Sequence, residues 1–153
     1  MMMRERKVRK ATTNDINSIH EIEKNSIKSA WSFEQLKTAF LQENYHFCVC
    51  DDGEVLGYIG VKITFDECEI MNIAVKESER GKGIGGELIK ALVEFCQQNK
   101  VSRILLEVRE SNNTAITFYK RHEFHEIFKR KKYYSDGEDA VIMEQKLVSL
   151  AQE

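Results

Sequence analysis

The segment with the clearest chemical signature is a glycine-rich run at residues 80–86, Arg-Gly-Lys-Gly-Ile-Gly-Gly, which holds half of the chain's eight glycines. Glycine costs a helix about 1 kcal/mol relative to alanine, so four glycines before the amphipathic run at residues 87–98 indicate that the backbone approaches a ligand closely. The N–H groups at a helix N-terminus have no intrahelical acceptor and carry the positive end of the helix dipole. The pattern therefore predicts a loop that binds a pyrophosphate.

Two other phosphate-binding classes share parts of this spacing. Residues 81–86 have the outer spacing of a Walker loop, but Glu87 and Leu88 stand where that loop needs Lys and Ser or Thr, which excludes it. The same glycines satisfy G-x-G-x-x-G, and Glu107 lies 21 residues beyond Gly86, as the ribose-binding acid of a dinucleotide fold would. Against that class, residues 76–80 separate the strand from the glycines, and the 46 residues after Glu107 are too few for a doubly wound sheet.

Two side chains have the chemistry of proton transfer. Glu107 lies near the end of the strand pattern at residues 103–109, and we expect it to be partly buried, which would raise its pKa toward neutrality. Tyr119 lies on the next helical pattern, and a tyrosine, with a pKa of about 10, keeps its proton at neutral pH and can donate it. A solvated acid and a core aromatic are the structural alternatives for these two residues.

The elements that would position these residues follow from the hydrophobic periodicity. A helix begins near Asn14 and another is capped by Ser32, while Asp52 and Gly53 mark a hairpin. Strands are predicted at residues 7–10, 47–50, 55–64, 68–75, 103–109, 124–133 and 139–147, and helices at 12–25, 32–41, 87–98 and 113–122. Hairpins in the first half and a strand-helix-strand unit in the middle predict a mixed α/β sheet.

Composition limits the remaining possibilities. The chain has 153 residues, no proline and 42% hydrophobic residues, which suits a single domain over residues 1–153. The polar start and the lack of a long apolar run predict a cytoplasmic protein with no membrane contact, and its four cysteines are expected to be reduced. Twenty-three basic against 25 acidic residues give no general attraction to nucleic acid, and the basic run at 129–132 is expected to be a solvated edge.

The spacing of Arg80, Gly83 and Gly85 resembles the acyl-CoA signature of the GNAT N-acetyltransferase superfamily, Q/R-x-x-G-x-G/A. More narrowly, the chain from about residue 7 to 147 resembles the RimI-type and related Ard1-type N-terminal acetyltransferases. The motifs that carry this resemblance, in order along the chain, are Asn72-Ile73-Ala74-Val75, Leu106-Glu107-Val108-Arg109 with Ser111-Asn112, Ala115, Phe118-Tyr119, and Tyr133-Tyr134 with Gly137-Glu138-Asp139-Ala140.

The resemblance implies a GNAT fold, with a mixed, mostly antiparallel sheet of about seven strands and about four helices, and acetyl transfer from acetyl-CoA without a metal. The acceptor would be the N-terminal α-amine of a protein, an alanine of a ribosomal protein in the RimI type. Glu107 matches the general base, which would act through a water, and Tyr119 matches the proton donor to the thiolate. Coenzyme A would be bound by Ile73, Ala74, Val75, Arg80, Gly81, Lys82, Gly83, Ile84, Gly85, Gly86 and Asn112, and the acceptor by Trp31, Tyr133 and Tyr134.

Two departures from the family pattern concern local geometry and the acceptor. Glu123 occupies a position after the predicted helix where the family has glycine, and where a left-handed backbone is expected. The family's proline before tryptophan is absent at residues 29–31. Two alternatives remain. The chain could acetylate lysine side chains or a small-molecule amine, or it could be a non-catalytic protein that binds acyl-CoA or a dinucleotide.

Overall fold

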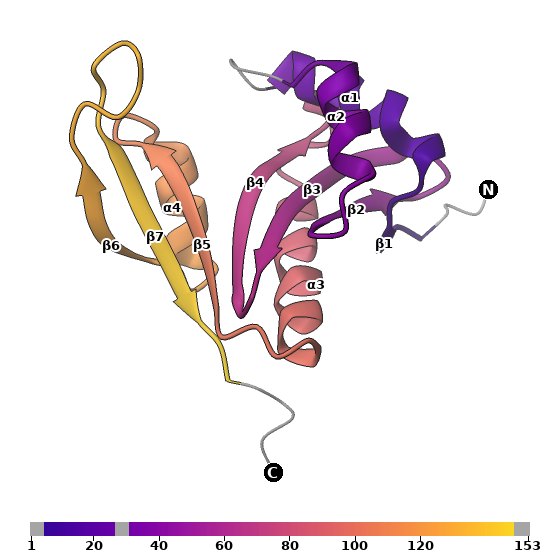
Figure 1. The fold of residues 1–153 in the computed structure, drawn as a ribbon. Coiled ribbons are helices and arrows are strands. Elements are labelled where there is room, and N and C mark those ends of the chain that lie inside the picture. Colours follow the sequence, from indigo (N-terminus) through magenta and orange to yellow (C-terminus); the bar gives the residue numbers. More distant parts are fainter. Residues whose placement is uncertain (1–4, 27–30, 149–153) are drawn as a thin grey trace. The chain divides into compact units, whose positions relative to one another are not determined.

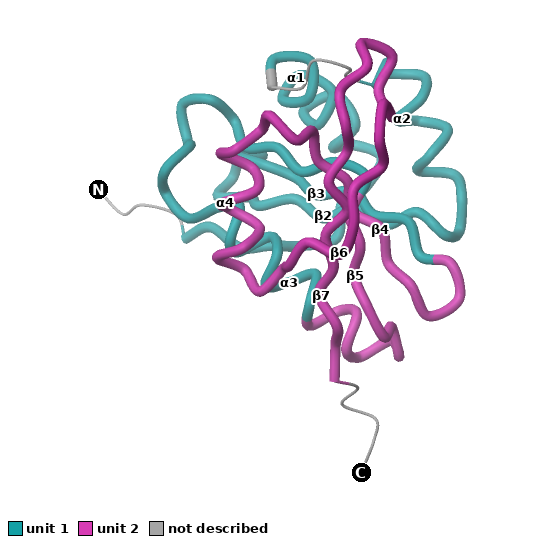
Figure 2. Tube along the Cα trace, turned by 90° about the vertical axis from the view of Figure 1, so that its left-hand side faces the viewer, with its two compact units in different colours: residues 1–63, 71–93 teal, residues 64–70, 94–153 magenta. Residues whose placement is uncertain are grey.

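The computed structural model describes residues 5–26 and 31–148. The described residues contain seven strands, in the sheet order β1-β2-β3-β4-β5-β7-β6, and four α-helices (Figure 1). Of the strand pairs described, only β4 with β5 is parallel. This confirms the mixed, mostly antiparallel sheet that the resemblance implied. The chain divides into two compact units, residues 1–63 with 71–93 and residues 64–70 with 94–153 (Figure 2).

The first unit is built from an antiparallel meander and the helices on it. Its elements are β1 (Lys7–Lys10), η1 (Thr13–Asp15), α1 (Ile16–Ser26), α2 (Phe33–Phe40), β2 (Tyr45–Asp51), β3 (Val55–Thr64), the end of β4 (Glu67–Val75), η2 (Glu77–Glu79) and the start of α3 (Ile84–Gln98). Ser32 caps α2 in a capping box with Gln35, as its type predicted. Gly53, with φ 111°, makes the predicted turn between β2 and β3.

The two faces of this meander have different partners. Phe47, Val49 and Tyr58 belong to one buried cluster, which also holds the apolar side chains of α1 and α2. Gly57 faces α3 instead, because a Cβ at this position would lie 3.1 Å from Cγ2 of Ile84. The alternation of side chains along β2 and β3 therefore places α1 and α2 on one face and the start of α3 on the other.

The second unit contains the start of β4, the end of α3, β5 (Arg103–Arg109), α4 (Asn113–Arg121), β6 (His125–Arg130) and β7 (Ala140–Lys146). β5 runs parallel to residues 67–69 of β4 and antiparallel to β7, which pairs with β6 on its other side. Ile104, Leu106 and Val108 are buried, as their alternation predicted.

Two predicted boundaries are wrong, while α3 begins at Ile84, with Gly85 and Gly86 in its first turn. The first predicted helix starts as a 3-10 turn, and its α-helical part starts at Ile16. β6 ends at Arg130, and residues 131–132 form a turn with Lys132 at φ 50°, so the basic run does not continue as an alternating strand.

Candidate active site

The glycine-rich loop has the backbone geometry that its sequence indicated. Gly81 and Gly83 have φ values of 78° and 84°, a left-handed conformation that side chains other than glycine rarely adopt. The carbonyl of Gly83 accepts the first helical hydrogen bond, from the N–H of Glu87 at 3.1 Å. Gly83 is therefore the N-cap of α3, and the N–H groups of Ile84, Gly85 and Gly86 are the first ones without an intrahelical acceptor. These N–H groups, together with the positive end of the dipole of a 15-residue helix, form a favourable binding site for an anion.

The same loop is tied to the end of β4. Nε of Arg80 donates to the carbonyl of Val75 at 3.2 Å, and Lys82 pairs with Glu79 at 2.9 Å. The cofactor residues Ile73, Ala74 and Val75 thus lie directly before the loop in the same unit. The segment predicted to bind pantetheine, residues 73–75, and the loop predicted to bind pyrophosphate, residues 80–86, therefore belong to the same unit.

Arg6 contacts this region, although no motif of the sequence singles it out. Its Nη2 donates to the carbonyl of Lys82 at 2.5 Å and lies 2.6 Å from Oε2 of Glu87, in the first turn of α3. A Cβ at Gly83 would lie 3.6 Å from the same nitrogen. Arg6 therefore contacts both the loop and the first turn of α3 from outside the glycine motif. Because it is far from the loop in the sequence, the contact is seen only in the structure.

Glu107 lies at the end of β5 opposite Ile142, and its side chain is exposed. Partial burial of this carboxyl group is therefore not observed, although Leu105 and Arg109 on the same face of the strand are half-buried. Oη of Tyr133 donates a 3.3 Å hydrogen bond to Oε1 of Glu107. The carboxylate, as a nearby negative charge and as this hydrogen-bond acceptor, raises the pKa of Tyr133.

Tyr134 completes an aromatic pair beside this carboxylate. The rings of Tyr133 and Tyr134 meet edge to face with centroids 5.2 Å apart, and the guanidinium of Arg109 lies 4.1 Å from the centroid of Tyr134. Arg109 is also paired with Asp136 at 2.8 Å and Glu138 at 3.0 Å. The structure thus brings Glu107, Tyr133 and Tyr134 together, as residues of one predicted site.

Tyr119 is 8% exposed and packs edge-on against Phe118 and Phe124. Burial raises the pKa of Tyr119, so its hydroxyl is protonated at neutral pH. Asn112 caps α4, because its Oδ1 accepts the N–H of Ala115 at 3.1 Å. Both side chains therefore have the structural role that their types allowed, beside the functional role that the resemblance implies.

Trp31, the third predicted acceptor residue, belongs to the first unit. The centroid of its ring lies 6.3 Å from that of Tyr45, in an edge-to-face arrangement. Its backbone N–H donates to Oε2 of Glu23 at 2.9 Å. Residues 29–30, where the family's proline is missing, lie outside the described residues.

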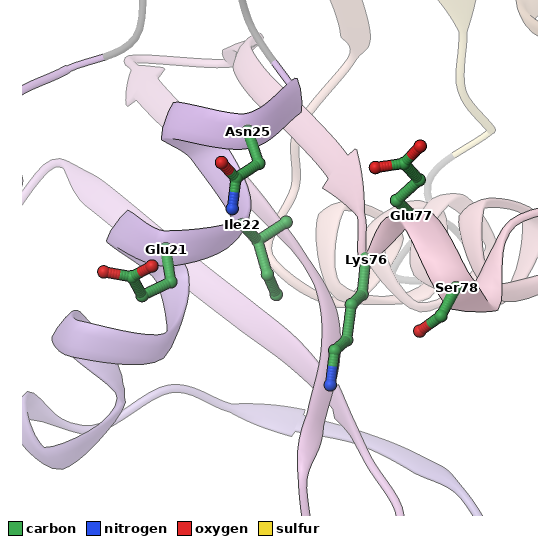
Figure 3. A pocket seen from close by; sticks show the side chains of 6 residues that line it. All are labelled: Glu21, Ile22, Asn25, Lys76, Glu77 and Ser78. Atoms are coloured by element: carbon green, nitrogen blue, oxygen red, sulfur yellow. The ribbon is translucent and has the colours of Figure 1, made fainter.

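A hollow of about 570 Å³ lies in the first unit between α1 and the turn that follows β4 (Figure 3). It is lined by Glu21, Ile22, Asn25, Lys76, Glu77 and Ser78. None of these residues belongs to the predicted site, although Lys76 directly follows the cofactor segment at residues 73–75.

The described residues hold neither a metal-binding group nor a helix that could span a membrane. Within the described ranges, no group of three or more His, Cys, Asp and Glu side chains is placed to hold a metal ion. None of the described helices has the length and apolar character needed to cross a membrane. In that same part of the chain all four cysteines are free thiols.

Comparison with known proteins gives the class. Residues 12–124 match the Acetyltransferase (GNAT) family, and the chain belongs to this family of acetyl-CoA-dependent N-acetyltransferases.

Within this family, the chain is similar to enzymes that acetylate protein N-termini. A Bacillus subtilis protein, whose own assignment as a [ribosomal protein bS18]-alanine N-acetyltransferase is provisional, is 39% identical over 89% of this chain and 92% of its own. The crystal structure of the ribosomal-protein-S18-alanine N-acetyltransferase from Escherichia coli superposes with a TM-score of 0.87 at 27% identity, over 97% of this chain and 98% of that one. Ard1 from Thermoplasma volcanium gives a TM-score of 0.85 at 28% identity, over 94% and 98%. The RimI-type and Ard1-type resemblance is confirmed.

Proposed function

We propose that the whole chain acts as one domain that transfers the acetyl group of acetyl-CoA to the N-terminal α-amine of a protein, the N-terminal alanine of ribosomal protein bS18. The observation that carries this proposal is the similarity to bS18-alanine N-acetyltransferases over nearly the full length of the chain. We further propose that the reaction takes place in the cytoplasm, without a nucleic acid or membrane partner and without a metal.

In this proposal the first unit binds acetyl-CoA. The backbone of residues 73–75 pairs with the pantetheine arm, and the N–H groups at the start of α3 bind the pyrophosphate, assisted by the cations of Arg80 and Lys82. Asn112 is assigned to the coenzyme A arm as well. The left-handed glycines at 81 and 83, together with the N-cap position of Gly83, support this assignment.

The chemistry is assigned to the second unit. Glu107, through a water, takes the proton from the α-ammonium group, and the free amine attacks the thioester carbon. The new C–N bond forms as the C–S bond breaks, and coenzyme A leaves as a thiolate. Tyr119 donates to this sulfur, and Tyr133, Tyr134 and Trp31 border the acceptor. The raised pKa of Tyr119 favours a hydrogen bond to the sulfur over complete loss of the phenolic proton.

The acid–base demand supports an α-amine over a lysine. An α-amine has a pKa of about 7.8 and needs about 1 kcal/mol to lose its proton at pH 7, whereas a lysine at about 10.4 needs about 4.6 kcal/mol. A single carboxylate that acts through a water, as proposed for Glu107, suits the smaller demand.

The experiment is a competition between two peptides of the same sequence. One has a free N-terminal alanine and no lysine, and the other is blocked at its N-terminus and carries one lysine. We expect the first peptide to be acetylated faster, and mass spectrometry of the mixture measures the ratio. Faster acetylation of the blocked peptide would reject the α-amine in favour of the lysine side chain.

A further inference from the structure

Glu23 on α1 is a fully buried carboxyl group that the reaction as assigned does not use. Its side chain is 0% exposed, and its two oxygens accept three hydrogen bonds. Oε1 accepts from Oη of Tyr58 and from Nδ2 of Asn72, both at 2.6 Å, and Oε2 accepts from the N–H of Trp31 at 2.9 Å. One side chain of α1 thus joins β3, β4 and the residue that precedes the cap of α2.

This arrangement is costly for a residue that only fills space. All three hydrogen-bond donors are uncharged, and burial raises the pKa of Glu23, so the loss of water is not offset by a charged hydrogen-bond donor. Ile19 and Ile22, its neighbours on the buried side of α1, show that apolar side chains fill this core. An apolar residue at position 23 would pack at least as well. A carboxyl group differs from an apolar side chain because its two oxygens hold three hydrogen-bond donors at defined positions.

Two of these donors belong to segments that the proposed reaction uses. Trp31 is one of the residues assigned to the acceptor site, and Asn72 directly precedes the cofactor segment at residues 73–75. Nδ2 of Asn72 donates to Oε1 of Glu23, so this contact determines which end of the Asn72 amide faces the carboxyl group. The NH₂ group points to Glu23, and the carbonyl Oδ1 points elsewhere. Asn72 is half-buried, so a ligand can reach it.

We propose that Glu23 is a positioning residue for the acceptor: it orients Asn72, whose Oδ1 accepts a hydrogen bond from the N-terminal residue of the peptide, and it fixes the backbone at Trp31. The inference rests on the proposed function and adds a specificity residue, Asn72, to it. Cofactor binding does not depend on this network, because the pyrophosphate loop and the backbone of residues 73–75 are retained without it.

The test uses the full chain, an alanine-starting peptide and four variants. Glu23→Gln keeps the size of the side chain but presents an NH₂ group to donors, and Asn72→Ala removes the amide. Tyr58→Phe is the matched control, because it removes one hydrogen bond to Glu23 and leaves Asn72 and Trp31 in place. The double variant Glu23→Gln with Asn72→Ala measures whether the two residues act together.

We expect Glu23→Gln and Asn72→Ala each to raise the KM for the peptide at least tenfold, while the Kd for acetyl-CoA, measured by calorimetry, stays within twofold. The double variant should have a KM no more than about threefold above that of Asn72→Ala, since Glu23 acts through Asn72. Tyr58→Phe should lower the Tm but leave the peptide KM within twofold.

A peptide KM within twofold of wild type in Asn72→Ala would overturn the inference, even if Glu23→Gln fails to fold. A lower Tm of Glu23→Gln with an unchanged peptide KM would overturn it as well, and would leave Glu23 with a structural role alone. The wild-type protein separates this inference from the proposed function, because absence of turnover of the alanine peptide by wild type would reject the function itself.

Discussion

The ring of Tyr119 packs against the ring of Phe124 across the turn that ends α4, with centroids 5.6 Å apart and planes at 68°. The backbone of the same two residues is joined, because the N–H of Phe124 donates to the carbonyl of Tyr119 at 3.0 Å. The N–H of Glu123 donates to the carbonyl of Lys120 at 3.3 Å, which completes a Schellman motif with its apolar contact. The turn therefore determines where the phenol of Tyr119 is presented.

Tyr119→Phe should retain this packing and remove only the hydroxyl. We expect the Tm and the affinity for acetyl-CoA to be unchanged, and kcat to fall about 10²-fold, because the leaving thiolate loses its donor. Steady-state kinetics together with thermal unfolding provide the measurement. A kcat within twofold of wild type would leave Tyr119 with a packing role only.

Glu123→Gly should stabilise the protein. Glu123 has φ 73°, which confirms the left-handed position expected at this helix end, and an L-residue there costs about 1 kcal/mol that glycine avoids. Urea denaturation should show an increase of about 1 kcal/mol in the free energy of unfolding, with unchanged kcat. Lys100→Gly, at φ 59° after α3, should behave alike, whereas Lys120→Gly inside α4 should cost about 1 kcal/mol.

Glu107→Gln should bind acetyl-CoA normally and lose about 10²-fold in kcat, because the amide cannot take the proton of the acceptor. The matched control is Glu110→Gln, which removes another exposed carboxylate near the end of β5, one that pairs with Lys129 at 2.8 Å. Turnover of this control should stay within twofold. Equal losses in the two variants would indicate a general effect of charge rather than a base at position 107.

Gly85→Ala separates the structural role of the loop from its binding role. Gly85 lies in the first turn of α3, where alanine favours the helix by up to about 1 kcal/mol. We expect a higher Tm without ligand and a weaker Kd for coenzyme A, because the methyl group obstructs the approach of the pyrophosphate to the backbone. Calorimetry with coenzyme A measures the Kd, and an unchanged value would place the pyrophosphate elsewhere.

Asp15 should make stability depend on pH. Hydrogen bonds from the guanidinium of Arg9, at 2.8 and 3.0 Å, are the main cause that lowers the pKa of this buried carboxyl from its usual 3.8. A lowered folded-state pKa adds stability above the unfolded pKa, and this stability is lost as the pH falls through the folded-state pKa. Asp15→Asn should therefore cost about 2 kcal/mol at pH 7 and progressively less below about pH 4, as measured by urea denaturation across this range. A cost that does not change with pH would contradict this.

Local patterns were enough to predict most elements and the phosphate loop. Ser32 and its capping box, the Asp-Gly turn at residues 52–53 and the left-handed glycines act over a few residues, so their types determine the backbone there. Ile84, Gly85 and Gly86 form the first turn of α3 although glycine is a poor helix former, because the packing of the apolar face of the helix stabilises it.

The sequence by itself determined the family and the order of the elements, and it is the source of the proposed catalytic residues, because these depend on residue type and on spacing along the chain. The tertiary structure decided how each side chain is used. Glu23 followed the helical spacing of α1 like its apolar neighbours, but its partners Tyr58 and Asn72 lie 35 and 49 residues away. Glu107 is exposed, whereas Leu105 and Arg109 on the same face of β5 are half-buried. Burial and hydrogen-bond partners arise from segments that meet only in the folded chain.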